Sequence, residues 1–243
     1  MTQESLLDKY KRLAIIPARG GSKRIPGKNI RNFCGKPMIL HTLESARDSE
    51  IFDEIHVSTD SDTIADIADK AGFATKFMRP GSLADDQTPI MPVLKYVLEA
   101  YAGKGKNFSQ VWMLMACSPL IEASDYVSAA KLFDDHQGKS PLLGIAEYPV
   151  PVEWAFSLSN IDNSLTPVNP GMFSMRSQDI EKKYFDAGAF SAFPADQIRQ
   201  SKGAGQDKEF IGYVLDKSRV IDIDDEEDWK AAELLYRSLS GRK

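Results

Sequence analysis

The sequence predicts an α/β fold in which helices cover both faces of a mostly parallel sheet. The apolar run at residues 13–16 has the length and branching of a buried strand, and residues 54–58 and 111–115 are also predicted to form strands. Three other segments have helical patterns: residues 37–48, 61–71 and 89–101. Strands and helices that alternate at this spacing are typical of a parallel sheet with both faces covered.

Polar loops follow each of the three predicted strands. Residues 19–29 come after the first strand, Thr59 and Asp60 after the second, and residues 117–119 after the third. In a parallel sheet, ligands bind at the carboxyl ends of the strands. We therefore expect these three loops to converge on one site.

The pattern changes near residue 147. Residues 147–183 are rich in proline, asparagine and serine, and their apolar residues lack a helical period. We interpret this segment as an excursion from the core, built from short strands or loops, and call it the excursion. The core then comprises residues 1–146 and 184–243. A chain of 243 residues has room for one large α/β domain with such an appendage.

After the excursion, the chain is predicted to return to the sheet. Residues 185–193 and 210–215 have the composition of strands, and residues 220–224 are predicted to form a further strand. A last helix is expected at residues 226–239. Asp225 is the predicted N-cap of this helix, because acidic residues fill the first turn.

Composition argues against several classes of protein. With 42% hydrophobic and 27% charged residues, the chain is typical of a soluble globular protein. A net charge of −5 argues against a general nucleic-acid binder, so we expect no nucleic-acid partner. No stretch approaches the roughly 18 apolar residues of a membrane-spanning helix, and residues 1–5 do not begin a secretory signal. Cys34 and Cys117 lie far apart and are expected to be reduced, as in the cytoplasm.

The loop after the first strand says most about function. Its sequence from Ile15 to Asn29 contains two adjacent glycines, which let the backbone approach a ligand closely. Four cations and a hydroxyl accompany them: Arg19, Lys23, Arg24, Lys28 and Ser22. A strand that leads into such a turn predicts a polyphosphate site, whereas the alternative is a solvated basic loop. The loop lacks the GxGxxG and GKS/GKT patterns, which disfavours a dinucleotide dehydrogenase and a P-loop protein.

Asp222 and Asp224 form a candidate metal site. If residues 220–224 form a strand, these two carboxylates point to the same side and can converge on one cation. Magnesium prefers one or two carboxylates together with substrate phosphates. The residues alone are equally compatible with a solvated acidic segment before an acidic helix start. The predicted polyphosphate loop favours the metal interpretation.

Two segments that contain arginine are weaker candidates. Arg79 has carboxylates a few residues downstream, so it suits either a phosphate ligand or a structural carboxylate partner. Arg176 and Gln178 precede Asp186 and Gly188, a combination that suits a hydroxyl-rich acidic ligand. Taken without further context, both segments are better explained by ordinary structural interactions.

Together these segments resemble the acylneuraminate cytidylyltransferases, the enzymes that make CMP-sialic acids. The opening motif of that family is matched at Pro17, Ala18, Arg19, Ser22, Lys23, Pro26, Lys28 and Asn29. Further family motifs are matched by Val57-Ser58-Thr59-Asp60, by Arg79-Pro80 with Leu83 and Asp86, by Ser118-Pro119-Leu120 and by Ile221-Asp222-Ile223-Asp224. These matches span nearly the whole chain. Residues 176–188 are most similar to the pseudaminic acid branch.

The resemblance implies a Rossmann-like nucleotidyltransferase fold and a reaction that joins CTP to a nine-carbon α-keto sugar acid, with release of pyrophosphate. The implied nucleotide-binding residues are Ala18, Arg19, Gly20, Ser22, Lys23, Lys28, Asn29, Arg79 and Ser118. The implied catalytic residues are Arg19, Lys23, Asp222 and Asp224, of which the two aspartates hold Mg²⁺. The implied sugar-binding residues are Arg176, Gln178, Asp186 and Gly188. No general base is assigned.

The excursion is expected to mediate dimerisation. Its apolar residues include Trp154, Phe156, Met172 and Phe173, in a segment too irregular to build its own core. Apolar side chains on such an appendage need a partner surface, which is most often a second copy of the chain. The resembled family also looks dimeric through a comparable insertion. We therefore expect a homodimer in which the excursion places Arg176 near the sugar pocket.

Two residues depart from the family patterns. Met115 stands where the N-acetylneuraminate branch usually has glutamine, and Ala189 stands where the pseudaminic branch usually has glutamine. The sugar is therefore left open among pseudaminic acid and related sialic acids. The alternatives are a CMP-N-acetylneuraminate or CMP-Kdo synthetase and a nucleotide-binding module without catalysis.

Overall fold

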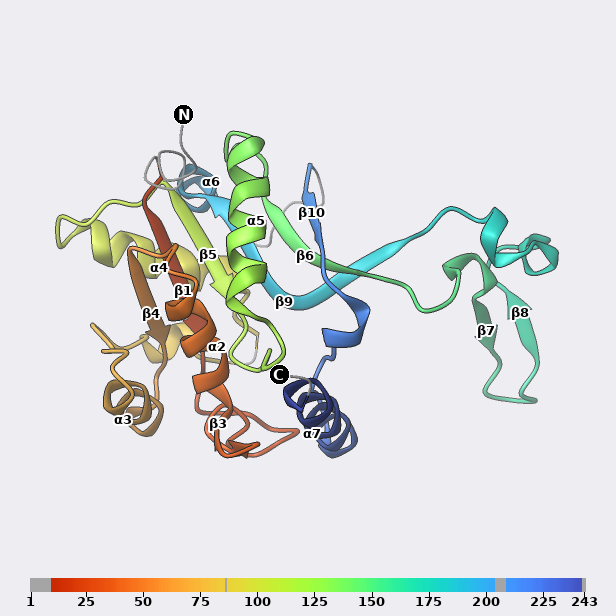
Figure 1. Cartoon of the computed structure of the whole chain (residues 1–243), viewed down its shortest axis with the longest axis horizontal. Coiled ribbons are helices and arrows are strands. Elements are labelled where there is room, and N and C mark those ends of the chain that lie inside the picture. The colour runs from red at the N-terminus through yellow and green to blue at the C-terminus, as the bar shows by residue number, and fades with distance from the viewer. Residues whose placement is uncertain (1–9, 86, 204–208, 242–243) are drawn as a thin grey trace.

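Six strands form one sheet in the order β10-β6-β9-β5-β1-β4 (Figure 1). The computed structural model describes residues 10–85, 87–203 and 209–241. The strands of this sheet are β1 (Arg12–Pro17), β4 (Glu54–Ser58), β5 (Gln110–Leu114), β6 (Leu142–Glu147), β9 (Tyr184–Pro194) and β10 (Ile211–Val214). β1 pairs in parallel with β4 and β5, and β10 pairs in parallel with β6, whereas β9 is antiparallel to both its neighbours. The predicted mostly parallel sheet is confirmed.

The side chains of β1 alternate between two hydrophobic clusters. Ala14 and Ile16 belong to one cluster, and Leu13 and Ile15 belong to the other, with all four fully buried. Successive side chains of a strand point to opposite faces, so a central strand that is apolar throughout requires cover on both sides. The alternation explains why helices lie on both faces of the sheet.

The helices supply that cover. On the face of Ala14 lie α2 (Met38–Asp48), α3 (Asp62–Lys70) and α5 (Ala123–Asp135), and on the face of Leu13 lie α4 (Ile90–Ala102) and α6 (Ala195–Gln200). The predicted helices at 37–48, 61–71 and 89–101 are confirmed. α5 and β6 were not predicted, although Glu122 and Asp125 form a capping box at the start of α5.

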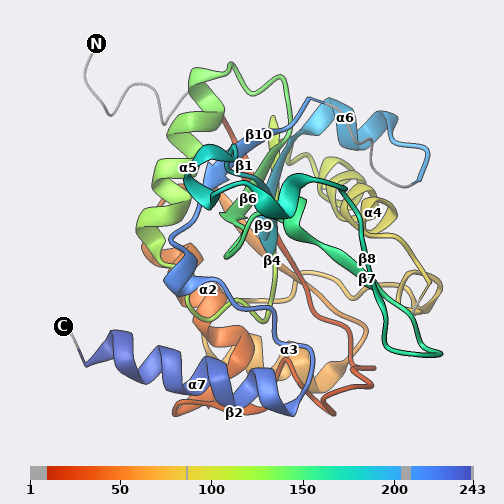
Figure 2. The ribbon, with the colours of Figure 1, turned by 90° about the vertical axis from the view of Figure 1, so that its right-hand side faces the viewer.

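The last helix, α7 (Glu226–Ser240), packs against the loop that follows β1. Asp225 is its N-cap, as predicted, and the Asp225 side chain accepts hydrogen bonds from the backbone of Glu227 and Asp228. Trp229 packs edge-on against Phe33, with the ring centroids 5.4 Å apart. Phe33 belongs to the short ribbon of β2 (Asn32–Phe33) and β3 (Lys36–Pro37), and Figure 2 shows α7 lying beside β2. The end of the core chain is thereby held next to its first loop.

Residues 220–224 do not form the predicted strand. After β10, the backbone of Leu215 still donates to the carbonyl of Ile145, at 2.8 Å. The short 3₁₀ helix η5 (Lys217–Arg219) then turns the chain away from the sheet. β10 is an edge strand, and none of the described strands pairs with residues 220–224. This segment is therefore held by side chains instead of a β ladder.

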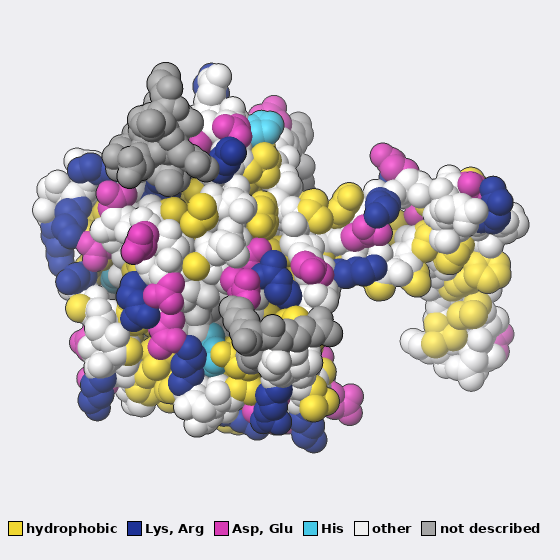
Figure 3. All heavy atoms as spheres, viewed as in Figure 1, with side chains coloured by type: hydrophobic (Ala, Val, Ile, Leu, Met, Phe, Trp, Pro, Cys, Tyr) yellow, Lys and Arg dark blue, Asp and Glu magenta, His cyan; other side chains and the backbone are white. Residues whose placement is uncertain are grey.

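The excursion extends away from the sheet (Figure 1). It contains a two-stranded ribbon, β7 (Phe156–Leu158) and β8 (Leu165–Pro167), and three 3₁₀ helices: η2 (Val152–Trp154), η3 (Met172–Ser174) and η4 (Ser177–Asp179). The Phe173 ring contacts the rings of Trp154 and Phe156, yet Phe173 remains 66% exposed. Figure 3 shows hydrophobic side chains gathered on this part of the molecule. Within one chain, the apolar surface of the excursion is only partly covered.

One more short helix, η1 (Gly81–Leu83), lies between α3 and α4. None of the helices in the described part of the chain is both long enough and apolar enough to cross a membrane.

Candidate functional site

The loop after β1 contacts the end of the neighbouring strand β4 and the loop that follows it. Ala18 donates its backbone N–H to the carbonyl of Ser58 at the end of β4, at 2.9 Å. Gly20 donates its N–H to the Oδ1 atom of Asp60, at 3.0 Å. A Cβ atom on Gly20 would lie 3.1 Å from the Cβ of Ser61, so the close approach of the two loops favours glycine there. The loops after β1 and β4 are thus brought together, as expected from the sequence.

A cavity of about 370 Å³ opens beside this loop. It is lined by Pro17, Arg19, Ser22, Lys23, Arg24, Ile25, Lys28, Asn29, Met115, Ala116, Cys117, Asp222 and Asp224. The cavity therefore brings the cationic loop, the chain after β5 and both candidate metal ligands to one place. Met115 and Ala116 were not predicted to line the site, although their position directly after β5 is the signal that would have identified them.

The carboxylates of Asp222 and Asp224 lie close enough to two cations of the loop, Arg24 and Lys28, to interact with them electrostatically. The Arg24 guanidinium is 2.6 Å from Asp224 Oδ2, and Lys28 Nζ is 3.8 Å from Asp224 Oδ1. Lys28 Nζ also donates to the carbonyl of Ile223, at 2.6 Å. Burial raises the pKa of Asp222, and the negative charge of Asp224 raises it further. The sequence missed the contact of Lys28 with Ile223, which joins residues far apart in the chain.

Asp222 and Asp224 are suited to a magnesium ion that also binds phosphate. Within residues 10–85, 87–203 and 209–241, no cluster of three or more His, Cys, Asp or Glu side chains is placed to hold a metal. Two carboxylates in the wall of a cavity lined by cations match the preference of Mg²⁺ for few protein ligands and several phosphate or water oxygens. A raised pKa for Asp222 also fits a carboxylate that a cation would stabilise in its charged form.

Several predicted nucleotide-binding residues lie around the cavity instead of in its wall. Gly20 lines a smaller neighbouring cavity together with Arg19 and Ser22. Ser118 lines a further small cavity, of about 10 Å³. Arg79 is buried, and it donates from Nε and Nη2 to Ser58. The structure thus gives Arg79 a partner on the strand end that supports the loop. Asp86, which belongs to the same motif, lies outside the described residues.

The predicted sugar-binding residues are not brought to the cavity within one chain. Arg176 and Gln178 lie on the excursion, where the Arg176 side chain is 72% exposed and pairs with Asp179. Asp186 and Gly188 lie in β9, where Asp186 Oδ1 accepts the N–H of Gly188 at 2.9 Å. Gly188 has a φ of +60°, a backbone conformation that favours glycine. None of these four residues lines the cavity of the cationic loop.

Comparison with known proteins identifies relatives of this chain. The profile of the family described as "Cytidylyltransferase" matches residues 13–145, more than half of the chain. A pseudaminic acid cytidylyltransferase of Campylobacter jejuni is 36% identical over 233 residues, which cover 93% of this chain and 97% of that protein. A CMP-N,N'-diacetyllegionaminic acid synthase of Legionella pneumophila is 32% identical and covers 92% of this chain and 95% of its own length.

Solved structures support the fold. A CMP:2-keto-3-deoxy-manno-octonic acid synthetase complexed with CTP superposes with a TM-score of 0.70, at 16% identity, and covers 94% of this chain and 99% of its own. A 4-diphosphocytidyl-2C-methyl-D-erythritol synthase from Anaerococcus prevotii gives a TM-score of 0.63 at 14% identity, and covers 96% and 99%. The family is established by the sequence matches, because the family profile covers more than half of the chain and a relative is 36% identical over 93% of it. This chain belongs to the cytidylyltransferase family.

Proposed function

We propose that this protein joins CTP and a nine-carbon α-keto sugar acid into a CMP-sugar and releases pyrophosphate. The observation that carries the proposal is the single cavity in which the cations of the glycine loop meet Asp222 and Asp224. A cavity with this lining suits a triphosphate together with a divalent cation. The names of the relatives, which make CMP derivatives of pseudaminic and legionaminic acids, support a nine-carbon sugar acid as the second substrate.

The proposed reaction is a displacement at phosphorus. The anomeric hydroxyl oxygen of the sugar acid forms a bond to the α-phosphorus of CTP, and the bond from that phosphorus to the β-phosphate oxygen breaks. The hydroxyl proton is lost to a base that we do not assign. Arg19 and Lys23 line the cavity, where they hold the triphosphate and neutralise the departing pyrophosphate. Catalysis then rests on positioning and charge stabilisation, with no covalent intermediate on the protein.

The proposal includes Mg²⁺ held by Asp222 and Asp224. When bound, the ion would lower the negative charge that opposes the nucleophile. Arg24 and Lys28 lie 2.6 and 3.8 Å from the Asp224 carboxylate and partly neutralise its charge. Lys28 is also engaged with the Ile223 carbonyl, so it contributes both to the charge of the site and to the position of the acidic segment.

The proposal extends to a homodimer in which excursions meet. The excursion exposes large apolar side chains, with Leu158 and Leu165 58% and 59% exposed. Such a surface on a projecting segment supports a second copy as its partner. In that dimer, Arg176 and Gln178 reach the sugar pocket of the neighbouring subunit. A cytoplasmic location is part of the same proposal, and it is supported by the free thiols of Cys34 and Cys117.

Pseudaminic acid is the proposed sugar, because the match of residues 176–188 to that branch agrees with the 36% identity to a pseudaminic acid cytidylyltransferase. The direct test is pyrophosphate release with CTP, Mg²⁺ and a panel of sugar acids. We expect release with a nine-carbon acid and little with 2-keto-3-deoxy-manno-octonic acid. Binding of CTP without pyrophosphate release with any acid of the panel would indicate a nucleotide-binding module and refute the proposal.

The metal assignment has its own test. Asp224→Asn should remove most of the turnover and keep the fold, because this half-exposed carboxylate lies outside the hydrophobic clusters. Asp196→Asn is a matched control, since Asp196 also pairs with an arginine at 2.6 Å but lies on α6, away from the cavity. Near-normal pyrophosphate release by Asp224→Asn at saturating Mg²⁺ would contradict the assignment.

A further inference from the structure

Residues 220–224 carry both aspartates of the cavity but have no β ladder to hold them. Metal-binding carboxylates need a fixed orientation, which supporting contacts normally supply. At the far end of the segment, the backbone N–H of Asp224 donates to Asp228 Oδ2, at 2.9 Å. In the middle, Ile223 is fully buried, and its carbonyl accepts from Lys28 Nζ. The near end of the segment begins directly after Arg219.

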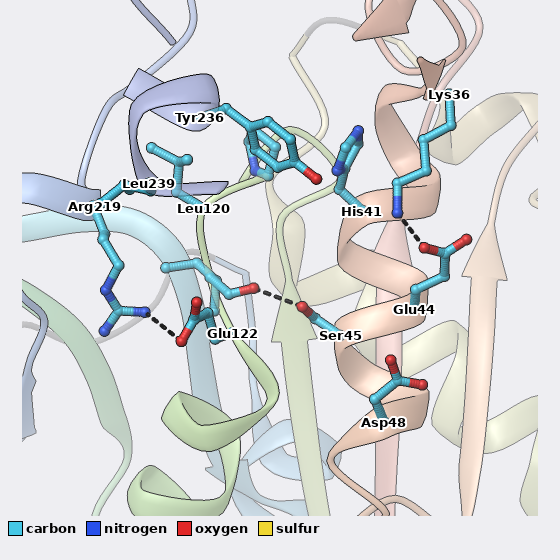
Figure 4. A pocket seen from close by; sticks show the side chains of 12 residues that line it. Lys36, His41, Glu44, Ser45, Asp48, Leu120, Glu122, Arg219, Tyr236 and Leu239 are labelled. Carbon is cyan, nitrogen blue, oxygen red and sulfur yellow. Dashed lines mark hydrogen bonds and ion pairs between the residues drawn. The ribbon is translucent and has the colours of Figure 1, made fainter. Parts of the chain in front are cut away.

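Arg219 makes a two-pronged ion pair with Asp125 at the start of α5. Its Nη1 lies 2.6 Å from Asp125 Oδ2, and its Nη2 lies 2.8 Å from Asp125 Oδ1. The side chains are only 19% and 3% exposed. Figure 4 shows Arg219 reaching toward Glu122, whose carboxylate is 3.9 Å away. A bidentate pair of this kind fixes both the distance and the plane of the two groups.

Asp125 is itself held by two other parts of the core. Its Oδ2 accepts the backbone N–H of Glu122, which closes the capping box of α5. Its Oδ1 accepts the hydroxyl of Tyr213 in β10, at 3.2 Å. Through Asp125, the Arg219 guanidinium is therefore held in position by both α5 and β10. A group so anchored is a fixed point for residues 220–224, which follow it.

The start of α5 is also tied to the chain that lines the cavity. Ser45 of α2 donates its hydroxyl to the carbonyl of Ile121, at 2.7 Å, and Ser45 faces the same loop in Figure 4. Thr42, one turn earlier on α2, donates to the carbonyl of Met115 in the cavity wall, at 2.9 Å. Arg219 thus connects the acidic segment to the same framework that positions the chain after β5.

We propose that Arg219, through its pair with Asp125, is a positioning residue that sets where Asp222 and Asp224 stand in the cavity. The inference rests on the proposed function, because it takes these aspartates as the ligands of a divalent cation. Arg219 does not line the cavity of the cationic loop, and the cavity that it shares with Ser118 is a separate one of only about 10 Å³. Its loss should therefore weaken cation binding and leave the metal-free binding of CTP unchanged.

The central variant is Arg219→Lys, which keeps the charge and loses the bidentate geometry. The matched control is Arg199→Lys, because Arg199 pairs with Asp196 at 2.6 Å on α6, outside the cavity. The measurements are hydrogen exchange of the peptide that covers residues 220–225 in the ligand-free protein, and Mn²⁺ binding in the presence of CTP, followed by electron paramagnetic resonance. Calorimetry with CTP in EDTA reports the remaining nucleotide affinity.

For Arg219→Lys, we expect faster exchange at residues 220–225 and a loss of Mn²⁺ affinity of roughly 10-fold, the lower end of the 10–100-fold range for groups that contact a metal ligand directly, because Arg219 acts through the backbone. CTP affinity in EDTA should stay within about twofold of the unaltered protein, and Arg199→Lys should change none of the three. Asp125→Asn should reproduce the effect, and the double variant should add little to either single change, because both remove one shared interaction.

Unchanged exchange at residues 220–225 in Arg219→Lys overturns the inference, whatever the protein's substrate. Faster exchange with unchanged Mn²⁺ affinity also overturns it, because the segment then moves without effect on the cation. Failure of the proposed function is seen separately, as a lack of pyrophosphate release by the unaltered protein with every sugar acid. The exchange and Mn²⁺ measurements need no turnover, so they decide the role of Arg219 in that case as well.

Discussion

Replacement of His56 should make the protein less sensitive to acid. His56 lies in β4, where only 1% of its surface is exposed, and its ring stacks on Phe77 with the centroids 4.4 Å apart. Its Nδ1 is 3.3 Å from the hydroxyl of Tyr101, and its Nε2 has no hydrogen-bond partner. Burial, with smaller contributions from the charges of Lys104 and Arg79, lowers the pKa of His56 from 6.5 to about 3.

The sign of the effect follows from this lowered pKa. Below pH 6.5 the unfolded chain takes up a proton at His56 that the folded protein does not accept until the pH approaches 3. Stability is therefore complete above pH 6.5 and is lost progressively as the pH falls toward 3. At pH 5, about 1.5 pH units below the unfolded pKa, the loss due to His56 is about 2 kcal/mol. That is a large share of a typical domain stability of about 5–15 kcal/mol.

The assay compares His56→Phe with the unaltered protein in urea unfolding at pH 7.5 and pH 5.0, followed by tryptophan fluorescence. Phenylalanine keeps the stack on Phe77 and has no titrating group. The contact that is lost with Tyr101 is absent at both pH values, so it cancels in the difference. We expect the free energy of unfolding to fall between the two pH values by about 2 kcal/mol less in His56→Phe. Equal losses in the two proteins would refute the reasoning.

Three further outcomes are expected. Lys23→Ala should weaken CTP binding by about 1.5–3 kcal/mol, which is the contribution of a hydrogen bond to a charged group. The same change should alter sugar-acid affinity far less. Unchanged CTP binding in calorimetry would show that the loop has been misassigned. In a mixed assay, pseudaminic acid should outcompete N-acetylneuraminic acid, and the opposite preference would place the protein with the N-acetylneuraminate enzymes. Light scattering should show a dimer at micromolar concentration, which the paired changes Trp154→Asp and Phe156→Asp dissociate. A fully active monomer would contradict the homodimer, and a dimer that survives both changes would move its interface elsewhere.

The cationic loop and its meeting with the loop after β4 could be predicted because local signals carry them, whereas the meeting with Asp222 and Asp224 followed only from the family resemblance. Adjacent glycines, dense cations and a preceding apolar run report on a few neighbouring residues, and the carboxyl-end rule for parallel strands then places the loops together. The N-cap role of Asp225 could be predicted for the same reason, since capping depends on residues within one turn.

The features that were missed depend on contacts between distant parts of the chain. The pair of Arg219 with Asp125 joins residues 94 positions apart, and no local pattern indicates it. Residues 220–224 have a composition that suits a strand, yet strand formation also needs an edge with which to pair, and the chain has already left β10. The roles of Arg176 and Gln178 remain predictions, because both residues lie on the excursion and neither lines the cavity of the cationic loop in its own chain.

The attachment of the excursion has a consequence for how this architecture can change. Glu147 at the end of β6 is paired directly with Tyr184 at the start of β9, so the excursion leaves and rejoins the sheet at one rung of an antiparallel ladder. Topologically it is an enlarged hairpin loop, and the entropy of closing such a loop grows only slowly with its length. Insertions and deletions within the segment can therefore occur without shifting the register of the six-stranded sheet. Change in the proposed subunit contact is thereby decoupled from change in the proposed nucleotide site.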